Sequence, residues 1–154
     1  ATVIFRGTIT SNATLTVRVI CKSQWGQHVP GCVSAAVVTD STLAGDVRSA
    51  ETIAAFRARL GGPADVILSD LAPKLTGIRD VDRARQLALC ETALGFCAEV
   101  LSSRGAFLIK LFSDSEGEAS RLLRERFRSV SAYRPGTTRK GSSEIYCLCT
   151  DPRS

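Results

Sequence analysis

Ala64-Asp-Val-Ile-Leu-Ser-Asp-Leu-Ala-Pro-Lys-Leu-Thr-Gly77 is the stretch of sequence that decides the fold. It begins with a short apolar run, Val66-Ile67-Leu68, which follows Gly61-Gly62-Pro63 and precedes a second turn rich in Pro and Gly. Such a brief run between helix breakers predicts a buried strand of a parallel sheet. Asp70 stands at its end, where open α/β sheets bind ligands. Asp70 is therefore a functional acid or a cap of the following turn, and the spacing leaves both interpretations open.

Helical and strand patterns alternate on both sides of this stretch. Apolar residues recur at helical spacing in three segments, Arg48–Leu60, Asp80–Leu101 and Asp114–Arg128. Ala106–Phe112 predicts a second buried strand, and Ser129–Tyr133 and Glu144–Thr150 predict a closing pair. This order predicts the α/β class, with a doubly wound, mostly parallel, Rossmann-like sheet that ends in a carboxyl-terminal antiparallel hairpin.

The amino-terminal part of the chain is less regular. Two strand-like stretches, Ala13–Cys21 and Val33–Val38, flank a polar segment that contains the only Trp and the only His of the sequence. Leu43–Val47 predicts a short strand or a turn. We expect a single domain over residues 1–154, in which residues 1–40 are atypical.

The composition suits a globular chain with a basic surface. Of 154 residues, 44% are hydrophobic and 23% are charged, and the formal net charge of +5 permits a polyanionic partner without requiring one. Arg134, Arg139 and Lys140 form a cluster with no acid before Glu144, which suits either a nucleic-acid contact or a solvated loop. No apolar run approaches the ~18–20 residues that span a bilayer, and Ala1–Arg6 lacks the pattern of a signal peptide, so we expect no membrane partner.

The six cysteines contain no Cys-x-x-Cys pair and are accompanied by a single His, so we expect no metal site. Cys90 and Cys97 share one face of a helical pattern, and Cys147 and Cys149 share one face of a strand pattern. This spacing favours free thiols that pack as small hydrophobic side chains in a reducing compartment.

Three charged residues, Asp70, Lys110 and Glu144, lie in or beside apolar strand patterns. Because a lone buried charge is costly, we expect the three side chains to meet and to compensate one another. They could form an ion pair that holds the strands in register. Alternatively, the pKa of the lysine is lowered so that it can act as a base. Periodicity does not distinguish these interpretations.

Five groups of residues carry a resemblance to a known family: Gly45-Asp-Val47, Asp65-Val-Ile-Leu-Ser-Asp-Leu-Ala-Pro73 with Thr76-Gly77, Arg79-Asp-Val-Asp82, Gly105-Ala-Phe-Leu-Ile-Lys-Leu-Phe112 and Arg139-Lys-Gly-Ser-Ser-Glu-Ile-Tyr146. Over residues 45–150 the chain resembles the FtsJ-type ribosomal RNA 2′-O-ribose methyltransferases, most closely their mitochondrial branch. The resemblance implies S-adenosylmethionine-dependent methylation of a ribose 2′-hydroxyl in large-subunit ribosomal RNA.

The resemblance also implies roles for individual residues. The family's catalytic set is Lys-Asp-Lys-Glu, and its last three members fall on Asp70, Lys110 and Glu144. Lys110 would take or orient the hydroxyl proton, Asp70 would position Lys110 and the hydroxyl, and Glu144 would hold the geometry of the network. No segment matches the helix that carries the family's first lysine. Asp46 matches the acid that contacts the adenine end of S-adenosylmethionine, and Asp70 is a second candidate for contact with this cofactor.

The family's first cofactor motif, a strand that leads into a glycine-rich turn and Trp-Ser-Gln, is degenerate in this chain. Its nearest counterpart is Val17–Gln27, in which Trp25 and Gln27 match the Trp-x-Gln but the glycine turn is missing. Trp25 is therefore a further candidate for cofactor contact.

The resemblance finally implies partners and a location. Ribosomal RNA or a precursor of the large subunit would be the substrate, with its phosphates bound by Arg134, Arg139 and Lys140, and ribosome assembly factors are further candidate partners. The expected location is mitochondrial, with the bacterial cytoplasm as the alternative. The alternative function is that of a catalytically inactive, methyltransferase-like protein that acts as a ribosome assembly or structural RNA-binding factor.

Overall fold

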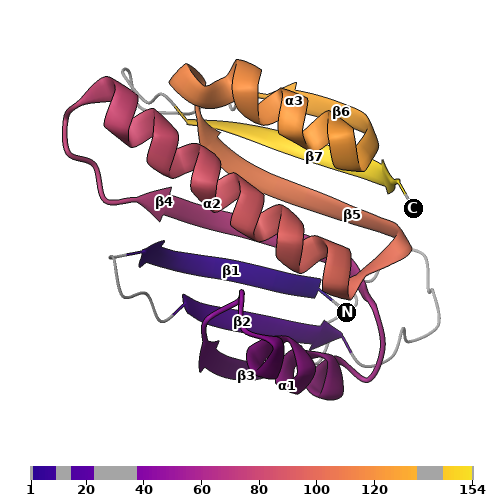
Figure 1. Ribbon diagram of the computed structural model, residues 1–154. Helices are drawn as coiled ribbons and strands as arrows, with labels where there is room; N and C mark the ends of the chain where they lie inside the picture. Colours follow the sequence, from indigo (N-terminus) through magenta and orange to yellow (C-terminus); the bar gives the residue numbers. More distant parts are fainter. Residues whose placement is uncertain (1, 10–14, 23–37, 135–143, 154) are drawn as a thin grey trace, which may run out of the picture.

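Seven strands form one sheet in a computed structural model that describes residues 2–9, 15–22, 38–134 and 144–153, with side chains from residue 46 onward (Figure 1). The strands are β1 (Thr2–Ile9), β2 (Leu15–Lys22), β3 (Val38–Gly45), β4 (Ala64–Pro73), β5 (Leu101–Phe112), β6 (Phe127–Tyr133) and β7 (Glu144–Pro152). The helices are α1 (Ala50–Leu60), α2 (Arg79–Val100), the short 3₁₀ turn η1 (Ser113–Ser115) and α3 (Glu116–Arg126).

The sheet has the order β3-β2-β1-β4-β5-β7-β6, and β1, β4 and β5 are parallel to one another. At one flank β2 is antiparallel to both β1 and β3, and at the other β7 is antiparallel to both β5 and β6. Five strands therefore run in one direction, and only β2 and β7 run in the other. The α/β class, the mostly parallel orientation and the closing hairpin of β6 and β7 are confirmed.

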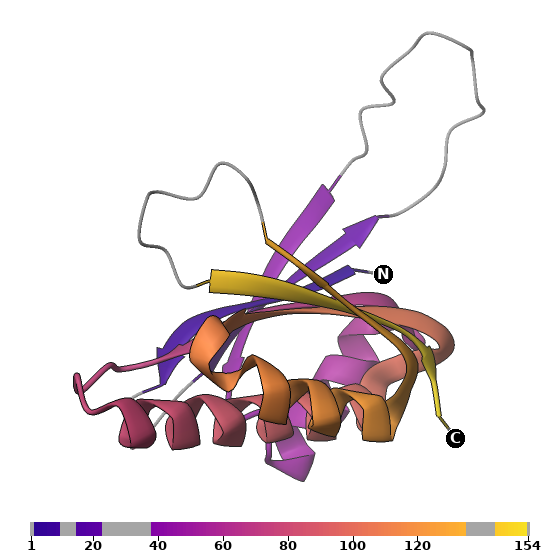
Figure 2. The ribbon, with the colours of Figure 1, turned by 90° about the horizontal axis from the view of Figure 1, so that it is seen from above.

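Helices on both faces were expected, but the described helices all cover one face (Figures 1 and 2). Phe56 of α1 contacts Phe96 of α2 edge-on, with ring centroids 5.1 Å apart, and α2 in turn contacts α3. Double winding requires crossover helices between parallel neighbours. Because β2 lies between β1 and β3 and is antiparallel to both, no such helix joins these strands among the described residues. The described helices therefore form one layer on the Rossmann-like sheet.

The amino-terminal strands also differ from the sequence patterns. β1 was not predicted, although all of it pairs with β4, from Thr2 beside Val66 to Ile9 beside Pro73. This pairing extends β4 beyond the predicted Asp65–Ser69, so Asp70 lies inside the strand rather than after it. The strand predicted over Val33–Val38 is described only from Val38, where β3 begins and runs on to Gly45.

The elements from α1 onward follow the sequence closely. Ser49 begins α1 by accepting a hydrogen bond from the Thr52 backbone N–H at 3.0 Å. Gly61 ends the helix in the left-handed conformation (φ 66°), where glycine has no Cβ to clash, and its N–H donates to the Arg57 carbonyl. The core between the helices and the sheet includes Cys90, Cys97, Cys147 and Cys149, which are free and buried. The prediction that these thiols pack as small hydrophobic residues is confirmed.

Alternation along the strands places the charged residues on the other face of the sheet. In β4 the side chains of Ile67, Ser69 and Leu71 are buried under the helices, whereas Asp70 points the opposite way. Ser69 pairs with Ile109 of β5, so Asp70 and Lys110 are the next residues along two adjacent strands. The fold thereby brings acid and amine together on the face that carries no described helix.

Candidate active site

Asp70, Lys110 and Glu144 converge, as the sequence predicted. Lys110 lies on β5 between its two neighbours in the sheet, and its Nζ forms an ion pair with Asp70 Oδ1 of β4. The same Nζ lies 3.4 Å from Glu144 Oε1 at the start of β7. The Lys110 side chain is only 14% exposed, whereas the side chains of Asp70 and Glu144 are 46% and 36% exposed. The ammonium is therefore partly buried between two carboxylates that solvent can reach.

The charges around Lys110 do not fit the interpretation in which its pKa is lowered. Burial acts to lower its pKa, but the hydrogen bond from Lys110 to Asp70 and the charges of Asp70 and Glu144 outweigh burial and raise the pKa above its usual value. Lys110 is therefore a cation at neutral pH. The prediction of a lowered pKa is wrong in this arrangement, because two acids lie against the amine and none of the described side chains adds a cation beside it. The ion-pair interpretation describes the observed geometry.

Asp70 does not cap the turn that follows β4. That role belongs to Asp82, whose carboxylate accepts hydrogen bonds from the Thr76 backbone N–H and hydroxyl, both at 2.8 Å, and from the Gly77 N–H at 3.0 Å. Of the two interpretations of Asp70, capping is wrong, and its carboxylate contacts Lys110 instead.

Asp46 lies at the same edge of the sheet as Asp70. Val17 of β2 pairs with Phe5 of β1 on one side and with Leu43 of β3 on the other. Phe5 also pairs with Ser69, so Leu43 and Ser69 lie in one row across the sheet. Because β3 and β4 run in the same direction, Asp46 emerges at the carboxyl edge, where open α/β sheets bind ligands.

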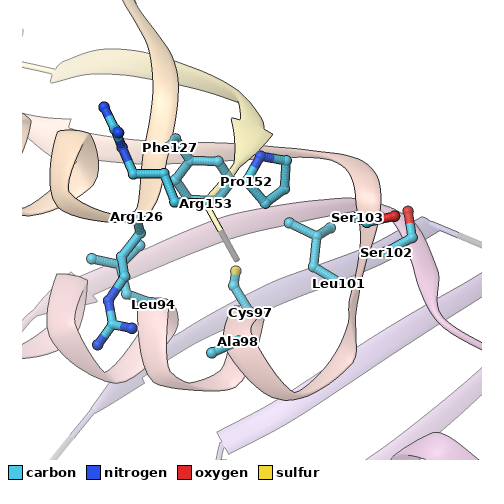
Figure 3. A pocket seen from close by; sticks show the side chains of 10 residues that line it. All are labelled: Leu94, Cys97, Ala98, Leu101, Ser102, Ser103, Arg126, Phe127, Pro152 and Arg153. Atoms are coloured by element: carbon cyan, nitrogen blue, oxygen red, sulfur yellow. The ribbon is translucent and has the colours of Figure 1, made fainter.

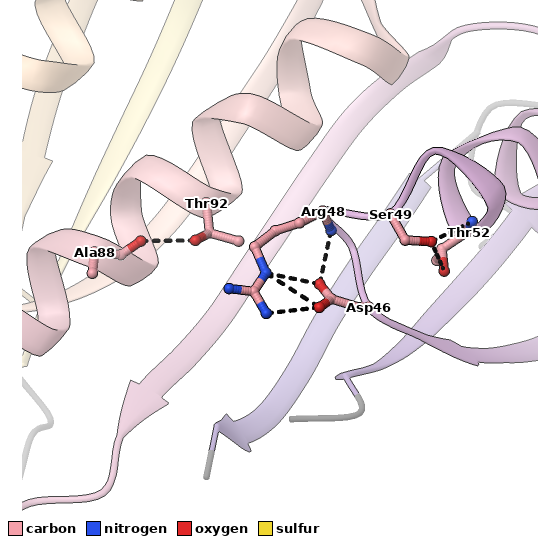
Figure 4. A network of polar contacts seen from close by, with 6 residues as sticks. All are labelled: Asp46, Arg48, Ser49, Thr52, Ala88 and Thr92. Carbon is pink, nitrogen blue, oxygen red and sulfur yellow. Dashed lines mark hydrogen bonds and ion pairs between the residues drawn. The ribbon is translucent and has the colours of Figure 1, made fainter. Parts of the chain in front are cut away.

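The carboxylate of Asp46 already has a partner in Arg48 (Figure 4). It accepts hydrogen bonds from the Arg48 backbone N–H at 2.9 Å and from the guanidinium Nε and Nη2 at 3.0 and 2.7 Å. These hydrogen bonds lower the pKa of Asp46 to about 2, so the group is an anion at neutral pH. The Asp46 side chain is 39% exposed, which leaves oxygen lone pairs open to a further donor.

The remaining predicted site residues are only partly described. Trp25, Arg139 and Lys140 lie outside the described residues. Arg134 is described, and its guanidinium Nη2 donates to Glu116 Oε2 of α3 at 2.6 Å. The sequence showed no acid close to Arg134 before Glu144, so this tertiary partner was missed.

Val17–Gln27, the nearest counterpart of the degenerate cofactor motif, begins in an antiparallel strand. Its described part, Val17–Lys22, belongs to β2, which runs antiparallel to β1. Lys22 pairs with Val38 at the beginning of β3, and therefore lies at the edge opposite to Gly45 and Asp46. β2 therefore does not lead into the carboxyl edge of the sheet. The described residues thus offer an acid suited to the adenine end of the cofactor, whereas no glycine cradle for the methionine end lies among them.

A cavity of about 370 Å³ lies elsewhere in the molecule (Figure 3). It is lined mainly by the end of α2, the start of β5 and the end of β7, with Cys97, Leu101, Phe127 and Pro152 among its lining residues. None of the predicted catalytic residues lines it. In the part of the chain that the structure describes, no group of three or more His, Cys, Asp or Glu residues could hold a metal ion, and no helix has the length and apolarity needed to cross a membrane.

Comparison with known proteins identifies related chains. Residues 24–152 match the family model described as FtsJ-like methyltransferase. "Ribosomal RNA large subunit methyltransferase E" of Methanothrix thermoacetophila is 43% identical over 108 residues, which are 70% of this chain and 42% of that protein. The protein of the same name from Stenotrophomonas maltophilia is 43% identical over 109 residues, or 69% of this chain and 51% of the relative. The chain therefore spans about half the length of these relatives.

A solved structure shares the fold. The crystal structure of a ribosomal RNA methyltransferase from Plasmodium falciparum superposes with a TM-score of 0.56 at 21% sequence identity. The match covers 70% of this chain and 57% of that one. The likeness supports the Rossmann-like arrangement of helices and strands.

Proposed function

The chain belongs to the FtsJ-like methyltransferase family, and from this premise we propose that it transfers a methyl group from S-adenosylmethionine to a ribose 2′-hydroxyl of large-subunit ribosomal RNA. The relatives named ribosomal RNA large subunit methyltransferase E support this choice of substrate. The single observation that carries the proposal is the position of Lys110 between Asp70 and Glu144, on the face of the sheet that carries no described helix.

The chemistry of the site follows from these charges. S-adenosylmethionine supplies a methyl group bonded to a sulfonium sulfur. The hydroxyl oxygen forms the new bond to this carbon while the carbon–sulfur bond breaks and its electron pair stays on sulfur, so the hydroxyl proton must leave. Because Lys110 is protonated, it donates a hydrogen bond to the hydroxyl oxygen and fixes its direction. The Asp70 carboxylate accepts the hydroxyl proton and, being 46% exposed, returns it to water.

The net charge of the site suits this reaction. Among the described side chains, two carboxylates and one ammonium meet here and leave one negative charge, which complements the positive charge of a sulfonium. Glu144 holds Lys110 from the side opposite to Asp70, so that the ammonium cannot turn away from the reacting oxygen. We assign Asp46 to the adenine end of the cofactor, because its ionised carboxylate can accept a hydrogen bond from the exocyclic amine while it retains Arg48.

The experiment that tests the proposal is methyl transfer by the full chain, with methyl-labelled S-adenosylmethionine and large ribosomal subunit RNA. After complete digestion, we expect the label in a 2′-O-methyl nucleoside. An RNA substrate that lacks the 2′-hydroxyl at the labelled position serves as the matched control and should remain unlabelled. A label that is recovered on a base would contradict the assignment of the ribose oxygen as the nucleophile.

A second candidate function is an RNA-binding assembly factor without methyl transfer. The observation that favours it is the direction of β2, which leaves the methionine end of the cofactor without a described cradle. Calorimetric titration with S-adenosylmethionine separates the two functions, because only the enzyme is expected to release or absorb heat. We also propose a mitochondrial location, or alternatively a bacterial cytoplasmic one. The likeness of the quoted motifs to the mitochondrial branch is its only support.

A further inference from the structure

Three large apolar side chains are exposed where β4 leads into α2. Leu75, Ile78 and Val81 are 59%, 62% and 37% exposed. They follow the strand that carries Asp70, and Figure 1 shows this connection at the left edge of the view, just beyond the arrowhead of β4. Apolar groups that gather on a surface commonly mark a site of interaction. We call Leu75, Ile78 and Val81 the apolar platform.

The backbone below the platform is held in one conformation. The Asp82 carboxylate accepts three hydrogen bonds from Thr76 and Gly77, and the Thr76 hydroxyl accepts one from the Ile78 N–H at 3.2 Å. Gly77 has φ +81°, a conformation that L side chains rarely adopt. The exposure of Leu75 and Ile78 is therefore built into the turn and does not result from an unsupported loop.

The charges around the platform favour an anionic partner. Asp80 pairs with Arg83 at 3.3 Å and Asp114 pairs with Arg79 at 2.8 Å, and the charge of Arg85 helps to lower the pKa of Asp82, so each of these acids has a cationic neighbour. In contrast, Lys74 is exposed and has no ion pair among the described residues. Arg85 donates through Nη1 to the Lys74 carbonyl at 3.0 Å, which keeps the two cations together beside the platform.

We propose that the apolar platform binds an unstacked nucleobase of a single RNA strand, while Lys74 and Arg85 meet the flanking phosphates. A single strand offers apolar base faces that alternate with phosphates, and this matches an apolar surface bordered by cations. A duplex hides its base faces in the stack. The proposal rests on the proposed function, because the bound strand is the one whose ribose reaches Lys110. The platform thereby positions the neighbouring nucleotide for reaction.

A binding assay tests the proposal. A short, fluorescently labelled oligouridine strand is titrated with the full chain, and binding is measured by fluorescence anisotropy over a series of salt concentrations. The double variant Leu75→Ala/Ile78→Ala should weaken binding by about fivefold to tenfold, the lower range for loss of one base contact. The slope of log K against log salt should stay unchanged, because no charge is removed. Lys74→Ala should instead lower this slope by about 1. Leu148→Ala is the matched control, since Leu148 is also apolar and 45% exposed but lies on β7.

Three results would refute the proposal that the apolar platform binds single-stranded RNA. The double variant could bind oligouridine as tightly as the wild-type chain, as is expected if the platform binds a protein. It could change the salt slope as Lys74→Ala does, or double-stranded RNA could compete as well as the single strand. The assay needs neither cofactor nor methyl transfer. A chain that binds RNA through the platform but transfers no methyl group therefore refutes the enzymatic proposal alone, whereas methyl transfer that survives the double variant unchanged refutes the platform alone.

Discussion

Replacement of Lys110 by Met removes the charge at the centre of the candidate site and keeps a side chain of similar length. At the 3.4 Å between Lys110 Nζ and Glu144 Oε1, two unit charges attract by about 1 kcal/mol at the dielectric constant of water and by about 5 kcal/mol at an effective value of about 20. Both carboxylates are more than a third exposed, so solvent screening brings the result towards the lower figure. Together with the repulsion left between Asp70 and Glu144, we expect Lys110→Met to reduce the free energy of unfolding by about 1–2 kcal/mol.

The pH dependence of this difference distinguishes charge from packing. Because folding raises the pKa of Lys110, its protonation stabilises the folded chain fully at any pH below the ordinary lysine pKa of about 10.4. This stabilisation is lost as the pH rises through the pKa of the folded state. Denaturant titrations of the wild-type chain and of Lys110→Met, run at about pH 7, 9 and 11, should therefore show a difference that is constant at first and then shrinks.

A variant as stable as the wild-type chain at neutral pH would contradict a stabilising role for the Lys110 charge, and so would a stability difference that persists unchanged at the most alkaline pH. The second result would mean that the aliphatic part of Lys110 contributes by packing and that its charge does not. Arg128→Met serves as the control. Arg128 is exposed on β6, has no ion pair among the described residues, and should show no such pH dependence.

Three further predictions concern other residues. Arg48→Ala should return the pKa of Asp46 from about 2 towards the ordinary value for aspartate, as measured by NMR titration of the carboxyl carbon. A pKa that stays near 2 would mean that Arg48 does not cause the lowered pKa. Ser49→Ala should lower the free energy of unfolding by about 1 kcal/mol, because the Thr52 N–H loses its capping partner, while Ser49→Asp should retain most of the stability. In a Cys21→Ser/Cys32→Ser background, the four buried thiols should resist a thiol reagent until the chain is denatured. The reason is that burial raises the pKa of Cys90 and of Cys149 to about 12. Rapid labelling of the native chain would contradict their burial.

The part of the fold that surrounds the site could be predicted because local patterns determine it. β4 and β5 each contain a short apolar run, and alternation along these runs places Asp70 and Lys110 on one face. Parallel strands end at the same edge, so two strand patterns were enough to bring the two side chains together. β7, which begins with Glu144, was likewise predicted from its local strand pattern.

The features that the sequence did not predict depend on contacts between residues that are distant in the chain. The pairing of β1 with β4, and the direction of β2, are set by register across the sheet, which no local pattern encodes. The ion pairs Arg134–Glu116 and Arg79–Asp114 join residues 18 and 35 positions apart. The predicted direction of the Lys110 pKa shift was wrong for the same reason. The direction depends on whether burial or the two nearby acids have the larger effect, and only the distances between these groups decide which one does. Arg48, two residues after Asp46, was a missed partner that local sequence could have indicated.

The central claim is that Lys110, held by Asp70 and Glu144, orients the ribose hydroxyl for methyl transfer. The most direct measurement is the single-turnover rate of 2′-O-methylation by Lys110→Met, with affinity for the same RNA determined in parallel. The account predicts a rate about 10²–10⁴-fold below that of the wild-type chain, with nearly unchanged RNA affinity. A variant that methylates at the wild-type rate, or one whose loss of rate is matched by an equal loss of RNA binding, would contradict it.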